Sequence, residues 1–319
     1  MRLLPWLTAL CPALLIAAGC ETDFYARSVL EQDATRGRLA ETLVGDGETL
    51  ESAGRVDLHR RITMSDGVEI DVCVLKARGE DGEPAGASAK GTMVLLHGLG
   101  ESRAWLVSLG ERLAGMGYDV VLPDLRAHGR SGGRYVTWGA REKRDIKSVI
   151  DALTIAGAVS EEVCVFGESM GGTIAILYGA IDLRCRGVMA MAPYKDFEHA
   201  RKSLILVAPA ISDADWAKVR RRAAEIGEFD PSEASALDAA GKLDCPLLLV
   251  HGELDVITPA AHSKALFEAA DEPKKLILVP WANHNWRLLH TESWIAEQLD
   301  TMATTGRLEK TTAPESNIP

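Results

Sequence analysis

The sequence predicts an α/β fold in which a mostly parallel, eight-stranded sheet carries helices on both faces. Short, continuous apolar runs such as Thr92–Leu96 are typical of strands buried on both faces. Apolar residues at helical spacing follow these runs, for example Ile146, Val149, Ile150 and Leu153. With 319 residues, 47% apolar and 25% charged, the chain can bury a full core. Strands that alternate with helices favour a parallel sheet.

The elements follow in order along the chain. Arg55–Thr63 and Val68–Ala77 alternate with the period of strands, and Ser65–Gly67 makes the turn between them. The further predicted strands are Thr92–Leu96, Tyr118–Leu122, Val163–Phe166, Gly187–Ala192, Pro246–Val250 and Lys275–Val279, and the further predicted helices are Ser102–Gly115, Thr173–Ala180, Pro259–Ala270 and Trp286–Met302.

Residues 193–244 interrupt the alternation, which indicates an inserted helical cap. The cap carries the apolar run Leu204–Val207 and a basic helix near Trp216–Arg222. We therefore divide the chain into a signal peptide (1–19), an N-terminal tether or helix (20–54), a main domain (55–305) and a disordered tail (306–319).

The N-terminus has the pattern of an export signal. Arg2 is the only charge before Glu21, and a long apolar stretch lies between them. The ending Ile16–Cys20 resembles the lipobox of bacterial lipoproteins, in which the cysteine is acylated and becomes the first residue of the mature chain. We therefore expect Cys20 to be the lipidation site and the protein to be attached to a membrane at the cell envelope, periplasmic or on an outer membrane if there is one. Plain secretion and an uncleaved anchor are the alternatives.

Charge and cysteine usage exclude several classes. The net charge of −11 argues against nucleic-acid binding, which needs a basic face. Four cysteines remain after the signal and Cys20: Cys73, Cys164, Cys185 and Cys245. Their spacing is not that of a metal site. We expect buried thiols, although export would permit a disulfide.

A candidate nucleophile lies in Gly167–Gly171, which fits the pattern G-x-S-x-G around Ser169. The string also occurs at Gly129–Gly133, around Ser131. Context separates the two, because only Ser169 follows a predicted strand and precedes a predicted helix, as a nucleophile elbow requires. We expect Ser131 to be a loop residue.

A serine hydroxyl needs a base, and the base needs an orienting acid. Asp255 and His284 each follow the end of a predicted strand, in the chain order Ser, acid, His. Because the carboxyl ends of parallel strands meet at one edge of a sheet, Ser169, Asp255 and His284 are expected on one rim. The alternatives are Glu253 as the acid, and as base four histidines that we expect to be structural: His128, His251, His262 and His290.

Together these segments resemble the α/β-hydrolase family over about residues 55–305, and most closely its serine aminopeptidase-like, monoglyceride-lipase-like and Bem46-like members. The segments are His97–Gly100, Asp124–Ser131, Gly167–Gly172, Gly252–Asp255 and His284, with Arg141–Asp145 adding to the Bem46-like character. One departure is Ala127, where the family has glycine. The resemblance implies that the backbone N–H groups of Leu99 and Met170 form an oxyanion hole; otherwise His97-Gly98 is only a tight turn.

The family implies hydrolysis through an acyl-enzyme, with no metal or organic cofactor. We expect carboxylic esters as substrates. The expected attachment to a membrane favours lipid-like or cell-envelope esters. Amides or peptides and thioesters are alternatives, and a non-catalytic binding lipoprotein is the second class of function. No oligomeric state follows from the sequence.

Overall fold

The fold is described from a computed structural model, which covers residues 20–31, 35–79, 82–84, 89–204, 210–284 and 291–308. The predicted signal peptide, most of the apolar run Leu204–Val207 and the tail beyond residue 308 lie outside the described residues.

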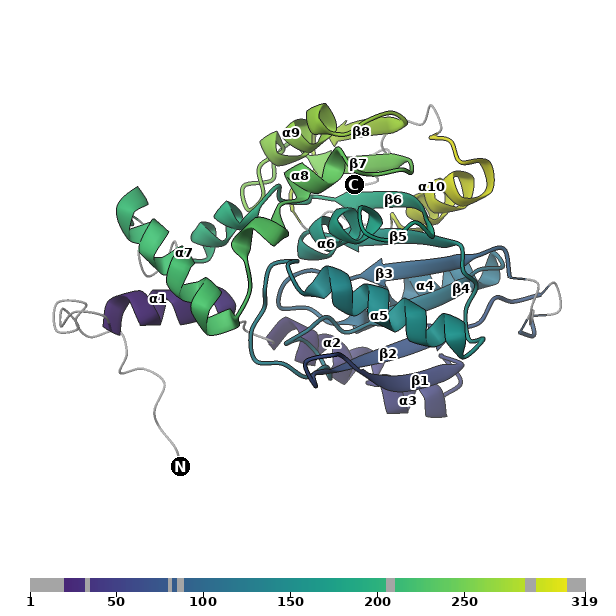
Figure 1. Ribbon diagram of the computed structural model, residues 1–319. Coiled ribbons are helices and arrows are strands. Elements are labelled where there is room, and N and C mark those ends of the chain that lie inside the picture. The colour runs from purple at the N-terminus through teal and green to yellow at the C-terminus, as the bar shows by residue number, and fades with distance from the viewer. Residues whose placement is uncertain are drawn as a thin grey trace.

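The predicted eight-stranded, mostly parallel sheet is confirmed (Figure 1). The strand order is β1-β2-β4-β3-β5-β6-β7-β8, and only β2 runs antiparallel to its neighbours β1 and β4. The strands are β1 (Leu58–Thr63), β2 (Glu69–Leu75), β3 (Thr92–Leu96), β4 (Asp119–Pro123), β5 (Val163–Glu168), β6 (Cys185–Met191), β7 (Leu247–Gly252) and β8 (Lys274–Val279).

Two apolar cores lie on the two faces of the sheet, as the continuous apolar strands predict. One core is built with Ile146, Ile174 and Leu266, and the other with Leu109 and Leu299. The helices on the first face are α5 (Glu142–Ile155), α6 (Met170–Gly179), α8 (Ala236–Ala240) and α9 (Ala261–Ala269), and those on the second are α4 (Val107–Gly115), which continues the short 3-10 helix η3 (Arg103–Leu106), and α10 (Glu292–Thr305).

The starts of α6 and α10 differ most instructively from the sequence prediction. Helix α6 begins at Met170, three residues before the predicted start at Thr173. Gly171 and Gly172 hide this start in the sequence because glycine is a poor helix former. Helix α10 begins at Glu292 rather than at Trp286, and residues 285–290 lie outside the described residues.

The N-terminal segment folds onto the domain. It forms α1 (Cys20–Leu30), α2 (Thr35–Val44) and α3 (Gly47–Ser52). The segment that we expect to be a cap contains η4 (Phe197–Leu204), α7 (Asp213–Gly227), η5 (Pro231–Ala234) and α8. Helices α1 and α7 pack against each other beyond the end of the sheet (Figure 1). Among the described helices, none is long and apolar enough to cross a membrane.

Candidate active site

Ser169 stands at a sharp turn between β5 and α6. Its backbone has φ 55° and ψ −116°, which is unfavourable for a residue with a Cβ. The glycines of the motif permit the turn. A Cβ on Gly167 would lie 2.1 Å from the carbonyl oxygen of Gly171, and one on Gly171 would lie 2.2 Å from that of Leu96. The strain and the two close approaches explain why the chemistry needs this residue pattern.

The structure brings Ser169, His284 and Asp255 together in one hydrogen-bonded chain. His284 Nε2 lies 3.0 Å from Ser169 Oγ, and His284 Nδ1 lies 2.6 Å from Asp255 Oδ2. Asp255 is buried, whereas Ser169 and His284 are partly exposed. The serine and the histidine can therefore be reached from solvent, while the Asp255 carboxylate is shielded.

The Asp255 carboxylate has a full set of donors. Its Oδ1 accepts hydrogen bonds from the backbone N–H groups of Ile257 and Thr258, at 2.9 and 2.8 Å. Burial alone would raise the pKa of Asp255, but hydrogen bonding to His251 and His284 outweighs burial and holds the pKa well below its usual value. The group is thus ionised at neutral pH, so it can orient an imidazole and stabilise its charge.

Asp255 and His284 meet because the loops after β7 and β8 are tied together. The N–H of Glu253 donates to the carbonyl of Val279, and that of Leu254 donates to the carbonyl of Ala282. Gly252 allows this contact, since a Cβ there would lie 2.3 Å from the oxygen of Ala282.

The residues expected to form the oxyanion hole flank Ser169. Met170 is the first residue of α6, so its N–H lies among the donors that a helix N-terminus leaves free. Leu99 lies in the loop after β3, where a Cβ on the neighbouring Gly98 would be 3.6 Å from Ser169 Cβ. The Gly98 N–H itself donates to Glu101 Oε2 at 3.0 Å.

Two buried histidines hold this loop against the loop after β4. His128 Nε2 accepts from the N–H of Gly100, and His97 Nε2 accepts from the N–H of Leu125, both at 3.0 Å. Each Nδ1 therefore carries the proton and donates to a backbone carbonyl at 2.8 Å. Burial lowers the pKa of both imidazoles, which keeps them neutral and preserves these tautomers.

Ser131 occupies a different position. Its hydroxyl donates to the carbonyl of Asp124 at 2.6 Å and accepts from the N–H of Asp71 at 2.8 Å. The structure gives it no histidine partner among the described contacts. Ala127, in the same loop, has φ 62°, a conformation that favours glycine. This explains why the family pattern has glycine there.

The sequence did not point to His199, which lies in η4 beside the triad. Its ring stacks on Tyr194 at 4.9 Å and meets His262 edge-on at 5.4 Å. Burial, aided by the charges of His262 and Lys202, lowers the pKa of His199 to about 3. The charge of His284 also lowers this pKa, and that of Asp255 opposes the shift. No periodicity or motif marks a histidine in a cap, so only the fold could reveal it.

Three more histidines were expected to be structural: His251, His262 and His290. His251 contacts Ser263 Oγ and the carbonyl of Thr258, at 2.7 and 2.6 Å. Burial lowers the pKa of His262 to about 4. His290 lies outside the described residues. The Nδ1 of His284 is bonded to Asp255 and not to Glu253, the alternative acid.

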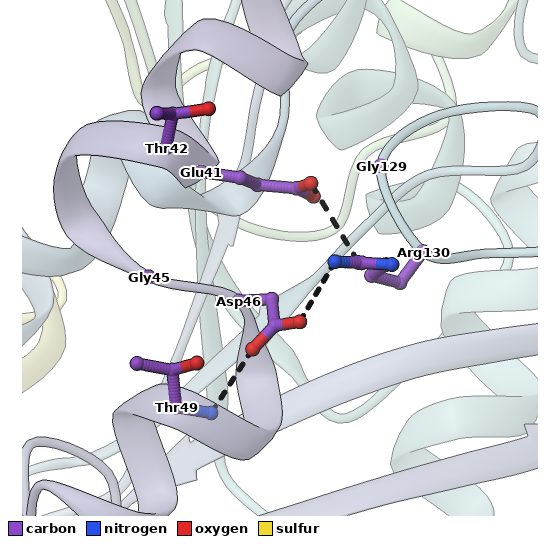
Figure 2. Close-up of a pocket in the computed structure, with 7 residues that line it drawn as sticks. All are labelled: Glu41, Thr42, Gly45, Asp46, Thr49, Gly129 and Arg130. Carbon is purple, nitrogen blue, oxygen red and sulfur yellow. Dashed lines mark hydrogen bonds and ion pairs between the residues drawn. The ribbon is translucent and has the colours of Figure 1, made fainter.

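A surface pocket of about 550 Å³ lies away from the triad, between α2, α3 and the loop after β4 (Figure 2). Arg130 spans it and pairs with Asp46 at 2.8 Å and Glu41 at 3.7 Å. Asp46 also accepts from the N–H of Thr49, which caps α3. The ion pairs of Arg130 therefore fasten the N-terminal segment to the loop after β4.

The described residues contain no cluster of three or more side chains that could hold a metal ion. Cys73, Cys164, Cys185 and Cys245 are buried and unbridged, with 3.8 Å between the sulfur atoms of Cys185 and Cys245.

Comparison with known proteins identifies the architecture. An esterase from Pyrococcus furiosus superposes with a TM-score of 0.57 at 22% identity, over 75% of this chain and 90% of that one. Acetyl xylan esterase 1 from a Thermoanaerobacterium species gives 0.59 at 15% identity, over 77% and 83%. The protein has the α/β-hydrolase fold.

Sequence relatives point the same way. Residues 87–226 of this chain match the family described as serine aminopeptidase, S33, a range that includes Ser169 but ends before Asp255. A monoacylglycerol lipase of Mycolicibacterium smegmatis is 29% identical, over 61% of this chain and 81% of that protein. The Bacillus subtilis protein YqkD is 25% identical over 60% of this chain but less than two thirds, 64%, of its own length.

Proposed function

We propose that the protein is a serine hydrolase that cleaves carboxylic esters. The observation that carries this proposal is the hydrogen-bonded chain from Ser169 through His284 to Asp255, built on a strained turn. A hydroxyl at 3.0 Å from an imidazole nitrogen, with a carboxylate behind it, is the arrangement that activates a serine.

In the proposed reaction, Ser169 Oγ attacks the ester carbonyl while its proton passes to His284 Nε2. The N–H groups of Leu99 and Met170 stabilise the oxyanion, an effect worth about 3 kcal/mol per donor. His284 then protonates the leaving alcohol, and the acyl group stays on Ser169. Water, activated by the same imidazole, releases the acid and restores the serine.

The names of the relatives favour esters, because a monoacylglycerol lipase and two esterases are among them. The description of the matched family as serine aminopeptidase favours peptides or amides as the second candidate. A series of p-nitrophenyl esters of increasing chain length, beside amino-acid β-naphthylamides, separates the two. Faster cleavage of the amides would overturn the ester proposal.

The serine is tested with a fluorophosphonate probe, which reacts only with activated serines. Wild type and Ser131→Ala should be labelled, and Ser169→Ala should not. Ser169→Ala should also lose at least about 10⁴-fold in kcat. An unlabelled, folded wild type would instead favour the non-catalytic binding protein.

We further propose that the protein is exported and acylated at Cys20. The support is the apolar stretch before Cys20 and its lipobox-like ending. Cells fed a radiolabelled fatty acid should label the wild type but not Cys20→Ala. Label in neither protein would contradict acylation.

A further inference from the structure

The proposed membrane attachment leaves no linker before the folded chain. Helix α1 begins at Cys20, the proposed acylation site. Many anchored domains turn freely because a flexible segment separates them from the lipid. In this protein the acyl chains would instead be attached directly to the first turn of a helix.

Helix α1 is fixed to the cap. Val29 and Leu30 are fully buried, and Asp23 pairs with Arg222 of α7 at 2.5 Å. The carbonyl of Val29 accepts from Trp138 Nε1 at 2.9 Å. The anchor helix is therefore packed and ion-paired against the cap.

The same contacts continue to His199 in the cap. Trp138 meets the His199 ring edge-on at 6.4 Å, and His199 lies where the charges of His284 and Asp255 act on it. Since α1 has 11 residues, it is about 16 Å long. Cys20 thus lies about 14 Å along the helix from Val29, whose carbonyl contacts Trp138.

Exposed apolar side chains flank the triad at this edge of the sheet. Leu254, Val256 and Ile257, on either side of Asp255, are 59%, 85% and 47% exposed. Phe24 of α1 is 50% exposed. Lys202 of the cap donates to the carbonyl of Ile257 at 3.0 Å. An apolar rim with a cationic side chain suits a lipid surface with anionic headgroups.

We propose that the rim formed by Leu254, Val256 and Ile257 docks on the bilayer that holds the acyl chains of Cys20, and that the substrate is an acyl ester resident in that bilayer. This proposal rests on the proposed function. The short, rigid connection through α1 keeps the cap at the membrane surface, so the ester reaches Ser169 directly from the lipid.

The opposite edge of the sheet supplies a matched control. Leu183 is 83% exposed, close to the 85% of Val256. Helix α6 starts next to Ser169 and runs toward the opposite edge of the sheet. Leu183 lies between the end of α6 and the start of β6. Leu183 is therefore apolar and exposed, but far along the sheet from the triad.

The docking is tested on the acylated full-length protein in vesicles of phosphatidylethanolamine and phosphatidylglycerol. Val256→Cys and Leu183→Cys each carry an environment-sensitive fluorophore, and vesicles with brominated acyl chains act as quenchers. We expect a blue shift and quenching at residue 256 only. Equal responses at both residues, or none at 256, would overturn the proposal. So would a shift that appears without lipid and grows with protein concentration, which indicates a second copy as the partner.

Substrate delivery is tested with a flexible insertion of 20 Gly and Ser residues after Glu21, which spans about 25 Å. Hydrolysis of a long-chain monoacyl ester in the same vesicles should fall about fivefold or more, while that of a soluble short-chain ester stays within twofold. Val256→Asp should show the same selective loss and Leu183→Asp should not. Equal activity in vesicles for the wild type, the insertion variant, Val256→Asp and Leu183→Asp would refute the proposal.

Failure of the underlying chemistry gives a different result. If the proposed triad is wrong, Ser169→Ala retains both activities, yet the fluorophores still report docking. If Cys20 carries no fatty acid and the protein leaves the vesicles, docking itself is refuted while soluble ester hydrolysis persists.

Discussion

The backbone of Ser169 is held in its strained conformation by two glycines with no room for a side chain. We expect Gly171→Ala to lower the free energy of unfolding by about 1–3 kcal/mol or more, because its Cβ would lie 2.2 Å from the Leu96 oxygen. Gly115→Ala is the control, since a Cβ there meets nothing within 4 Å. Urea unfolding measures both variants, and equal stabilities would contradict this account of the motif.

The buried His199 makes stability depend on pH. Its pKa is about 3 in the folded protein against about 6.5 in the unfolded chain. Between these values only the unfolded chain binds the proton, so stability falls as the pH falls from about 6.5 toward about 3.

His199→Phe keeps a ring to stack on Tyr194 but removes this proton. The slope of unfolding free energy against pH, measured near pH 5, should decrease by about 1.4 kcal/mol per pH unit. An unchanged slope would mean that the imidazole is protonated in the folded protein.

At the scale of elements, the loop after β3 is fastened from several sides. Gly100 donates to His128 Nε2, and its carbonyl accepts from the N–H of Gly37 in α2. We infer that these bonds position the Leu99 N–H toward the developing oxyanion. His128 is thus a positioning residue, which touches no substrate.

His128→Leu should lower kcat about 10-fold or more with KM within threefold, because oxyanion stabilisation acts mainly in the transition state. His128→Gln should recover part of the loss, since its amide oxygen can accept from Gly100. If KM rises and kcat does not change, the loop would serve substrate binding instead.

The sequence predicts elements well where burial is continuous and poorly where glycine or tertiary packing decides. β3 was predicted from Thr92 to Leu96, as observed, because all five positions are buried. The sequence does not predict the start of α6 at Met170, because Gly171 is a poor helix former. Glycine is required there because the backbone passes close to Leu96. Ser169, Asp255 and His284 could be placed on one rim from strand ends alone. His199 could not, because nothing local distinguishes a buried histidine in a cap.

At the scale of the whole molecule, the segment before β1 links the cap to the main domain. α1 contacts α7, and α2 contacts the loop after β3. Arg130 joins the loop after β4 to Asp46 and Glu41 (Figure 2). The sequence predicts only a tether or helix for this segment, because its apolar positions are sparse. The structure shows that several of these apolar side chains are buried against the domain.

A chain that begins at Thr35 should therefore be markedly less stable than one that begins at Thr22. The shorter chain loses the fully buried Val29 and Leu30, each worth about 1.5–3 kcal/mol. It also leaves Trp138 Nε1 without its acceptor, at a cost of about 1–3 kcal/mol. Urea unfolding of the two proteins, both without lipid, measures the difference. Because α1 supports the cap beside His199, turnover of a soluble ester should fall with it. Equal stability and equal turnover would show that α1 is a passive spacer. That result would also contradict the rigid connection between the anchor and the cap.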